Sequence, residues 1–400
     1  VRGNTGSRQE TARISVGLDE TLQKVVFQKE GNLNPLGEAL DFPLKPYTRY
    51  WYSIAVRSDQ GEEALSRPCF FETGKLDDPW KGQWLGVEDG DTHPEFQKTF
   101  SLPEKPRSAR LYICGLGLFE AYINGEKAGD DLLAPFLNDY TEHFQYCTYD
   151  VTSLLAEDNT LSVLLGDGWY RGHFGLGEPT HYDRPLALIA ELRMEFADGH
   201  RENLCSDSGW QYHGSFTTLS DIYNGETQDY TKALGGWKQP VLIPAPGRLC
   251  DRYSSPLHYM ESISVKEVIH TPAGETVLDF GQNFAGHVIC IQPLPKGTTM
   301  TLEFGEVLQN GNFYHENYRH AESKFTYVSD GIHREIRPRF TFFGFRYVKI
   351  SGLERVDAAC FEGRAIYSEM GRTGFIRTGN EKINRLFSNS LWGLKSNFLD

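Results

Sequence analysis

The chain has 400 residues and a formal net charge of −14 at pH 7. Because this length exceeds what one hydrophobic core usually serves, we expect roughly two to four domains. The acidic balance and the absence of any run of five Lys or Arg exclude a basic nucleic-acid-binding surface. The longest apolar stretches, such as 161–165, fall far short of the roughly 20 residues that a membrane helix needs, so no membrane partner is expected.

Seven cysteines are spread along the chain, odd in number and never arranged C-x-x-C. This pattern favours free thiols in the core over disulfides or zinc ligands. Unpaired thiols slightly favour a cytoplasmic protein, and no signal peptide is visible from Val1 onward. Export stays open, because a trimmed signal peptide would leave no trace.

Residues 1–76 are expected to form a small antiparallel β-sandwich. Apolar and aromatic side chains alternate along 49–57, which predicts a strand. The turn-forming residues 58–62 and a second extended run at 69–73 complete a hairpin. The strands before it look short, so this unit is expected to be incomplete.

Residues 77–255 are expected to form a larger β-sandwich or jelly roll. Short alternating runs, separated by Gly, Asn, Asp and Pro, recur here without a competing helical period. These runs predict strands at 96–102, 108–115, 119–123, 144–149, 160–165 and 186–196.

A third β-rich domain is expected over 256–368, after the Pro- and Gly-containing linker 241–248. The hydrophobic period then changes within 369–400, where Asn380 is a suitable N-cap. The apolar residues after it fall on one helical face: Ile383, Leu386, Phe387, Leu391, Leu394 and Phe398. The predicted fold class is therefore mainly β, with tandem antiparallel β-sandwich or jelly-roll domains and one carboxy-terminal helix. That helix either docks on a sandwich or opens a helical domain.

The segment 166–175 (GDGWYRGHFG) is the most unusual in the chain. Its glycines would let a ring or a guanidinium approach a ligand closely. An aromatic ring such as that of Trp169 or Tyr170 stacks on the C–H bonds of a sugar, while Asp167 and Arg171 can bind hydroxyls. The alternative interpretation is a tight loop with Trp169 tucked into the sandwich.

A second polar segment is 221–230 (DIYNGETQDY), where Asn224 and Gly225 indicate a turn. Its carboxylates could hold calcium through oxygen ligands, but their spacing is not that of an EF-hand loop. A solvated hairpin is the alternative. Asp130 and Asp131 could add oxygen ligands or merely occupy a turn.

No catalytic constellation is visible in the sequence. The chain has no H-E-x-x-H pair, G-x-S-x-G elbow, Walker loop or G-x-G-x-x-G fingerprint. Glu303 and Glu306 are close neighbours on one predicted strand end, whereas a glycosidase needs its two carboxylates on opposite sides of a bond. We therefore expect no catalytic residue within the chain.

Several segments, in this order, carry a resemblance. They are EAYINGEKAGDDLLAPFLNDY (120–140), GDGWYRGHFG (166–175), DIYNGETQDY (221–230), DFGQNFAGH (279–287), GEVLQNGNFYHENYR (305–319), PRFTFFGFRYVKISG (338–352) and SLWGLKSNFLD (390–400). In order and spacing they resemble the bacterial α-L-rhamnosidases of glycoside hydrolase family 78, over about residues 80 to 400.

The resemblance implies a modular enzyme: a fibronectin III-like unit, a jelly-roll domain, a concanavalin-like β-sandwich and an (α/α)6 catalytic barrel whose first helix lies in 369–400. In that family two barrel carboxylates invert the anomeric centre, one as general acid and one activating water. By this resemblance the chain ends before them, so it is expected to be inactive alone. The implied partners are a rhamnose-containing glycan or glycoside and the chain's own barrel, with no required cofactor.

Some members of the family also bind rhamnose through calcium in a jelly-roll domain that resembles carbohydrate-binding module family 67. This implies a candidate carbohydrate site at Asp167, Trp169, Tyr170, Arg171 and Asn224, with Asp167 and Asn224 as candidate calcium ligands. Two alternatives stay open: a stand-alone lectin-like protein that binds rhamnose-containing glycans, and a scaffold without a ligand.

Overall fold

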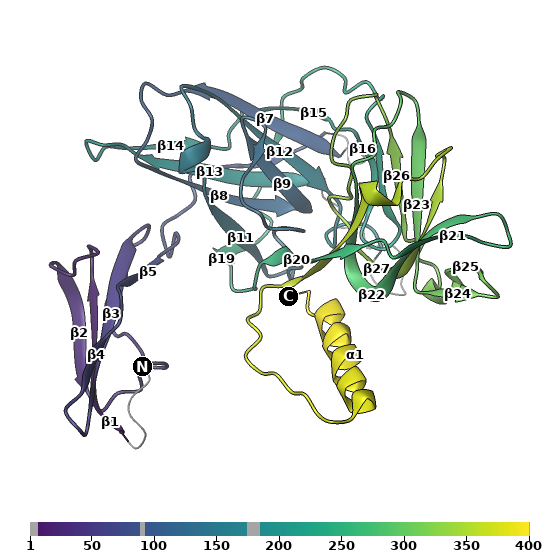
Figure 1. The fold of residues 1–400 in the computed structure, drawn as a ribbon. Coiled ribbons are helices and arrows are strands. Elements are labelled where there is room, and N and C mark those ends of the chain that lie inside the picture. The colour runs from purple at the N-terminus through teal and green to yellow at the C-terminus, as the bar shows by residue number, and fades with distance from the viewer. Residues whose placement is uncertain (1–6, 89–92, 174–184, 400) are drawn as a thin grey trace. The chain divides into compact units, whose positions relative to one another are not determined.

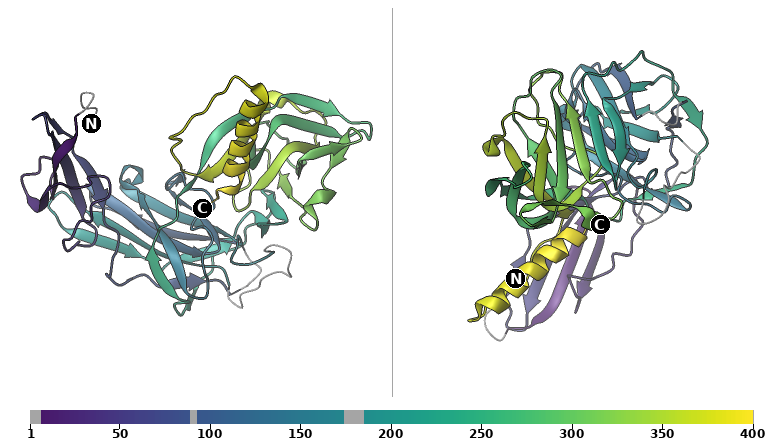
Figure 2. Two further views of the ribbon diagram at one scale, coloured as in Figure 1. Left: turned by 90° about the horizontal axis from the view of Figure 1, so that it is seen from below. Right: turned by 90° about the vertical axis from the view of Figure 1, so that its right-hand side faces the viewer.

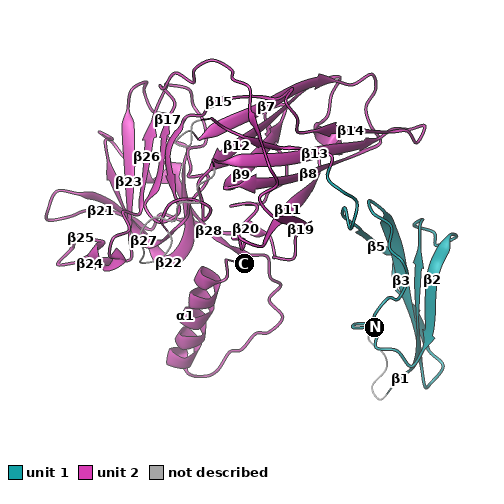
Figure 3. Ribbon diagram, turned by 180° about the vertical axis from the view of Figure 1, so that it is seen from behind, with its two compact units in different colours: residues 1–80 teal, residues 81–400 magenta. Residues whose placement is uncertain are grey.

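The computed structural model describes residues 7–88, 93–173 and 185–399 (Figure 1). Contacts divide the chain into two compact units, residues 1–80 and 81–400 (Figure 3). Strands dominate both units, and among the described residues one α-helix follows them near the carboxy terminus. The predicted mainly β fold class is confirmed.

The first unit is built on β3 (Arg49–Ser58), the strand that the alternating pattern predicts. It pairs with β5 (Cys69–Glu72), as the predicted hairpin requires. The sheet has the order β2-β1-β3-β4, adding β1 (Gln9–Gly17), β2 (Val25–Gly31) and β4 (Glu63–Leu65). The buried core gathers around Ile14, Val16 and Tyr50. The likeness to a fibronectin III domain stays a prediction.

The second unit opens with two sheets. The first has the order β10-β9-β12-β7-β15 and comprises β7 (Pro94–Ser101), β9 (Leu118–Ile123), β10 (Glu126–Lys127), β12 (Asp158–Gly166) and β15 (Gln211–Gly214). The second has the order β18-β6-β13-β8-β11-β19, with β14 paired to β13. It comprises β6 (Trp84–Gly86), β8 (Ser108–Leu116), β11 (His143–Asp150), β13 (Ala187–Glu195), β14 (Arg201–Cys205), β18 (Val241–Ile243) and β19 (Arg248–Asp251). Side chains of the two sheets meet, since the ring centroids of Phe119 and Tyr149 lie 6.5 Å apart.

The third sheet combines strands from both sides of the predicted boundary at 255. It has the order β16-β17-β26-β23-β27-β22-β28-β20, with β21 paired to β22. It comprises β16 (Thr217–Asp221), β17 (Gly225–Asp229), β20 (Leu257–Ser264), β21 (Glu267–His270), β22 (Thr276–Cys290), β23 (Thr299–Gly305), β26 (Lys324–Val328), β27 (Phe343–Ser351) and β28 (Phe361–Ser368). The hairpin β16–β17 therefore belongs to the third sheet, because β17 lies parallel to β26. The three boundaries between the four predicted domains stay a prediction.

The remaining elements are short, apart from the helix. They are the hairpin β24 (Val307–Gln309) and β25 (Asn312–Tyr314), and the 3₁₀ turns η1 (Thr152–Leu154), η2 (Glu316–Tyr318) and η3 (Ala358–Cys360). All seven cysteines are free, as the sequence predicts.

The helix α1 (Glu381–Asn397) confirms the predicted helix and its cap, because the Asn380 side chain accepts a hydrogen bond from the Lys382 N–H at 3.0 Å. Figure 2 shows α1 beside strands of the third sheet, and Trp392 packs against the core there. Leu386 is 63% exposed, so much of the predicted apolar face is not covered by the described residues. No helix among those residues is long and apolar enough to span a membrane.

A buried ion cluster joins the first sheet to the third. Glu120 on β9 is 3% exposed, and its Oε1 lies 2.7 Å from Nη2 of Arg337. Its Oε2 pairs with Arg339 and accepts a hydrogen bond from the Tyr122 hydroxyl at 2.5 Å. Burial raises the pKa of Glu120, but the opposing charges of Arg337, Arg339 and Lys127 outweigh burial and hold it well below its usual value.

A buried histidine lies beside this cluster. His287 on β22 is fully buried, and its Nε2 donates to the carbonyl of Thr341 at 2.7 Å. With that tautomer, Nδ1 accepts a hydrogen bond from the Tyr259 hydroxyl at 2.8 Å. Burial, followed by the nearby charge of Arg337, lowers the pKa of His287 to about 3, so the ring is neutral near pH 7.

Replacing the central carboxylate should destabilise the second unit strongly. Glu120→Ala removes the carboxylate that lies between two buried guanidinium groups, and we expect a loss of about 3–5 kcal/mol in the free energy of unfolding, measured by urea denaturation. The control is Glu322→Ala, which removes an exposed ion pair with Lys324 and should cost about 1 kcal/mol or less. Equal losses in both variants would contradict the structural role of Glu120.

Acid should destabilise the protein partly through His287. Its folded-state pKa of about 3 lies below the ordinary histidine pKa of 6.5, so the unfolded chain takes up the proton first. The stability from the neutral ring is complete above pH 6.5 and is lost as the pH falls toward 3. The free energy of unfolding of the wild type should therefore fall more steeply than that of His287→Gln, by up to about 1.4 kcal/mol per pH unit. Urea titrations between pH 4 and pH 7 measure both slopes, and parallel slopes would rule this contribution out.

Candidate functional site

The unusual segment after β12 begins where the first and third sheets meet. A Cβ on Gly166 would lie 2.3 Å from the Phe340 ring, so a larger residue does not fit there. Gly168 has a φ of 54°, and a Cβ on it would lie 2.4 Å from Leu118. These close contacts fix the backbone of the segment, which the structure describes as far as His173.

The two aromatic candidates turn toward the protein interior. The Trp169 ring centroid lies 4.9 Å from that of Phe136, and the side chain packs against a buried cluster that includes Phe340. Tyr170 is 2% exposed, with its ring centroid 5.2 Å from that of Tyr140. This is the packing that the tight-loop interpretation expects, and sugar binding by either ring stays a prediction.

The two charged candidates pair with each other. Arg171 Nη2 lies 2.7 Å from Oδ1 of Asp167, and its Nε donates to the same oxygen at 2.8 Å. The other oxygen, Oδ2, lies 3.3 Å from Nε2 of His93, just before β7. Both oxygens of Asp167 are thus close to nitrogen atoms of the protein.

The fifth candidate, Asn224, belongs to a neighbouring network. Asp221 Oδ1 accepts the backbone N–H groups of Tyr223 and Asn224 at 2.9 and 2.7 Å, which forms the turn that the sequence predicts. Asp221 Oδ2 accepts the backbone N–H of His173 at 3.0 Å and lies 2.8 Å from its Nδ1. The same ring nitrogen lies 3.1 Å from Nδ2 of Asn224.

A short connection joins these two networks. The Asp167 N–H donates to Oγ of Ser220 at 3.1 Å, and a Cβ on Gly172 would lie 2.8 Å from a carboxylate oxygen of Asp221. We call the combined set the β12-loop cluster: His93, Asp167, Arg171, His173, Asp221 and Asn224. Of the five predicted site residues, the structure brings Asp167, Arg171 and Asn224 into it and turns Trp169 and Tyr170 away.

Calcium does not fit the cluster as it is arranged here. Calcium requires free oxygen ligands, whereas Oδ1 of Asp167 is held by Arg171 and both oxygens of Asp221 are hydrogen-bonded. The Asn224 Oδ1 accepts the backbone N–H of Glu322 at 3.3 Å. An ion would have to displace the Arg171 guanidinium. Calcium binding through Asp167 and Asn224 therefore stays a prediction from the family resemblance.

A second acidic group lies near the start of β20. Oxygen and nitrogen atoms of Asp130, Asp131 and His258 lie within 4.8 Å of one another. Arg252 already pairs with Asp131, which also accepts a hydrogen bond from the Tyr149 hydroxyl at 3.2 Å. These partners make the group an ion-pair network of the protein itself.

Sequence reasoning missed both histidines of the β12-loop cluster. His93 lies far upstream of Asp167, and no local pattern links the two. His173 lies within the unusual glycine-rich segment 166–175, so its position in the sequence did mark it as a candidate. The Glu120 pairs with Arg337 and Arg339 have no sequence signal, because more than 200 residues separate the partners.

Two family models match the second unit in chain order. Residues 104–248 match the α-L-rhamnosidase N-terminal domain, and 269–367 match the bacterial α-L-rhamnosidase concanavalin-like domain. An α-L-rhamnosidase of Streptomyces avermitilis is 35% identical over 322 residues, which cover 76% of this chain and 31% of that protein. This chain belongs to the bacterial α-L-rhamnosidase family. It spans between 31% and 43% of the length of the curated rhamnosidases it matches.

Solved rhamnosidase structures share the fold over nearly the whole chain. The α-L-rhamnosidase of Aspergillus terreus superposes with a TM-score of 0.90 at 29% identity, covering 98% of this chain and 49% of that one. An α-L-rhamnosidase of Streptomyces avermitilis, crystallised with L-rhamnose, gives a TM-score of 0.89 at 23% identity, covering 98% of this chain and 57% of that one. Because the identity is only 23%, the comparison with the Streptomyces avermitilis structure shows a shared fold alone.

Trp169 should behave as a core residue. Trp169→Ala removes its contacts with Phe136 and Phe342, and we expect a loss of about 3 kcal/mol in the free energy of unfolding by urea denaturation. The control is Phe375→Ala, because that side chain is 79% exposed and should cost less than about 0.5 kcal/mol. A Trp169→Ala protein as stable as the control would show that the indole is not held in the core.

Proposed function

We propose that this chain is the amino-terminal part of a longer α-L-rhamnosidase that removes terminal α-L-rhamnose from glycans or glycosides. The observation that carries the proposal is the pair of rhamnosidase domains in family order at 104–248 and 269–367. The short span of the chain relative to its curated relatives supports a polypeptide that continues beyond Asp400.

In this proposal the two catalytic carboxylates lie in a part of the protein outside these 400 residues. An inverting glycosidase needs two carboxylates about 6.5–9.5 Å apart, one to protonate the leaving oxygen and one to activate water. The carboxylates of Asp167, Asp221 and Glu120 are already held by protein cations or N–H groups, so none is poised for either role. In this proposal the chain supplies accessory β domains, and hydrolysis requires no redox cofactor.

The proposed substrate class is a rhamnose-terminated glycan or glycoside. The support comes from relatives named α-L-rhamnosidases, of which one is 35% identical over 322 residues. We also propose a cytoplasmic location, supported by seven free thiols that a reducing compartment would preserve.

Hydrolysis of p-nitrophenyl α-L-rhamnopyranoside tests the proposal. The complete reading frame containing these 400 residues should release p-nitrophenol, whereas residues 1–400 alone should not. Proton NMR of the first product should show inversion, with β-L-rhamnose appearing before mutarotation. Activity of the 400-residue chain would overturn the assignment of the catalytic carboxylates, and an inactive complete protein would overturn the proposed activity.

Calorimetric titration with L-rhamnose, with and without calcium, tests the predicted carbohydrate site. Heat that depends on calcium and disappears in Asn224→Ala would support that prediction. Because the partly buried Trp169 packs against a buried cluster, Asn224 is the better variant for separating binding from folding.

A further inference from the structure

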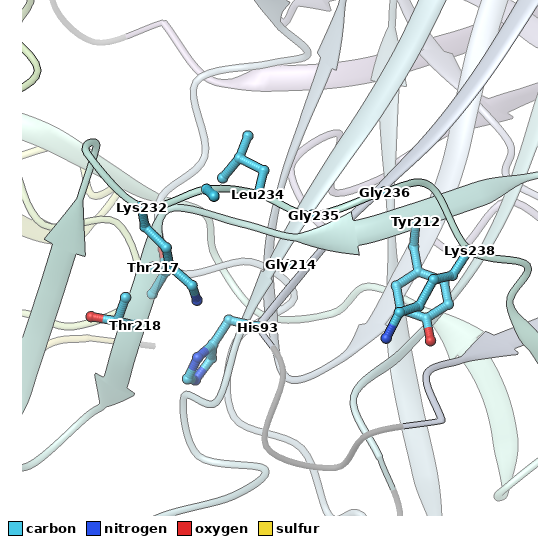
Figure 4. A pocket seen from close by; sticks show the side chains of 11 residues that line it. His93, Tyr212, Gly214, Thr217, Thr218, Lys232, Leu234, Gly235, Gly236 and Lys238 are labelled. Atoms are coloured by element: carbon cyan, nitrogen blue, oxygen red, sulfur yellow. The ribbon is translucent and has the colours of Figure 1, made fainter.

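A pocket of about 340 Å³ is lined by His93 and by residues from 212–218 and 232–238 (Figure 4). None of its described lining residues carries a carboxylate, so the pocket offers neither of the two groups that glycoside hydrolysis needs. In the proposed enzyme, this chain can still affect hydrolysis through the way it holds the polypeptide that carries those groups. The helix α1 is the last element before that polypeptide, so its attachment to the third sheet decides where that polypeptide starts.

The carboxy-terminal half of α1 is attached to the third sheet. Trp392 packs against the buried core there, and Lys395 pairs with the carboxylate of Glu261 on β20. Just after the helix, the carbonyl of Phe398 accepts the backbone N–H of Ser368 at 2.8 Å. By contrast, Leu386 in the amino-terminal half is 63% exposed. The helix is therefore held at the end that leads toward Asp400.

Four side chains make the polar part of this attachment, and we call Glu261, Tyr367, Trp392 and Lys395 the α1 anchor. The Lys395 ammonium lies 4.6 Å from the ring centroid of Trp392 and 5.4 Å from that of Tyr367, within the range of cation–π attraction. The Tyr367 hydroxyl donates a hydrogen bond at 2.9 Å to the same Glu261 oxygen that Lys395 approaches. Burial, followed by this hydrogen bond and the charge of Glu261, raises the pKa of Tyr367 to about 12, so the hydroxyl keeps its proton.

A β-bulge in β20 aims Glu261 at the helix. Tyr259 lies opposite Ile366 and Glu261 lies opposite Ala365, so two residues of β20 match one of β28. In a regular strand Glu261 would share a face with Tyr259, because side chains two residues apart point the same way. Directly opposite residues share a face, so the extra residue turns Glu261 to the side of Ala365. Ala365 belongs to the core cluster that Trp392 contacts, which is the side where α1 lies.

We propose that the α1 anchor positions the catalytic part of the complete rhamnosidase on the third sheet, with Glu261 and Lys395 as positioning residues. The inference rests on the proposed function, in which the polypeptide that carries the catalytic carboxylates continues from α1. When the ion pair is lost, the end of the helix moves and the residues after it inherit the displacement. An inverting glycosidase tolerates little displacement, because both carboxylates and a water must be aligned with one bond.

The first test measures hydrolysis of p-nitrophenyl α-L-rhamnopyranoside by the complete protein. Lys395→Met keeps the aliphatic stem and removes the charge. We expect its kcat to fall at least about threefold while KM changes less than about twofold, because alignment is lost and substrate binding is kept. The melting temperature of each variant is measured, and the assay is run well below it, so that unfolded protein does not lower kcat.

A matched control and a rescue separate positioning from a general loss of stability. Lys349 pairs with Glu303 at 2.7 Å between β27 and β23, whereas α1 contacts β22 and β28. Lys349→Met should therefore leave kcat unchanged. Glu261→Lys or Lys395→Glu alone places like charges together and should lower kcat at least as much as Lys395→Met. The two reversals combined restore opposite charges and should recover at least about half of the lost kcat.

The second test measures amide hydrogen exchange in residues 1–400 and requires no activity. In Lys395→Met, peptides from 391–397 should exchange at least about threefold faster than in the wild type, because the end of the helix is released. The same peptides should exchange at the wild-type rate in Lys349→Met.

Unchanged exchange in Lys395→Met would overturn the anchor itself. An unchanged kcat in that variant of an active complete protein, equal losses in Lys349→Met, or no recovery in the double reversal would overturn its positioning role. An inactive wild type would overturn the proposed function and with it the catalytic role of the anchor. The exchange experiment would then still decide whether the anchor holds α1, so the two failures are distinguishable.

Discussion

The arrangement of the second unit depends on the burial of Glu120 between Arg337 and Arg339. Buried charges are stable only when their partners are close and correctly oriented, so this contact tolerates little movement of the first sheet relative to the third. A second buried carboxylate, Glu226 on β17, strengthens the same joint by accepting the N–H groups of Arg339 and Phe340 at 2.9 and 2.8 Å. The segment between β26 and β27 is therefore fixed by carboxylates from two different sheets.

This joint also positions the β12-loop cluster. Phe340, held by Glu226, packs under Gly166 at the start of the β12 loop. The hairpin β16–β17 belongs to the third sheet and carries Asp221 at the end of β16. The hairpin thus contributes Asp221 and Asn224 to the β12-loop cluster, while Nε2 of His93, just before β7 of the first sheet, lies beside Asp167.

The sequence predicts where strands and the helix lie along the chain better than it predicts which strands pair and which side chains meet. Alternation locates β3 and β12, and the N-cap at Asn380 locates α1, because each signal lies within a few residues. Alternation does not say which sheet a strand joins, so 217–229 was placed with the preceding domain although it pairs with β26. The candidates Asp167, Arg171 and Asn224 meet in one cluster, but sequence could not show that Trp169 faces the core or that Asp167 lies beside His93. Those contacts depend on how distant strands are packed.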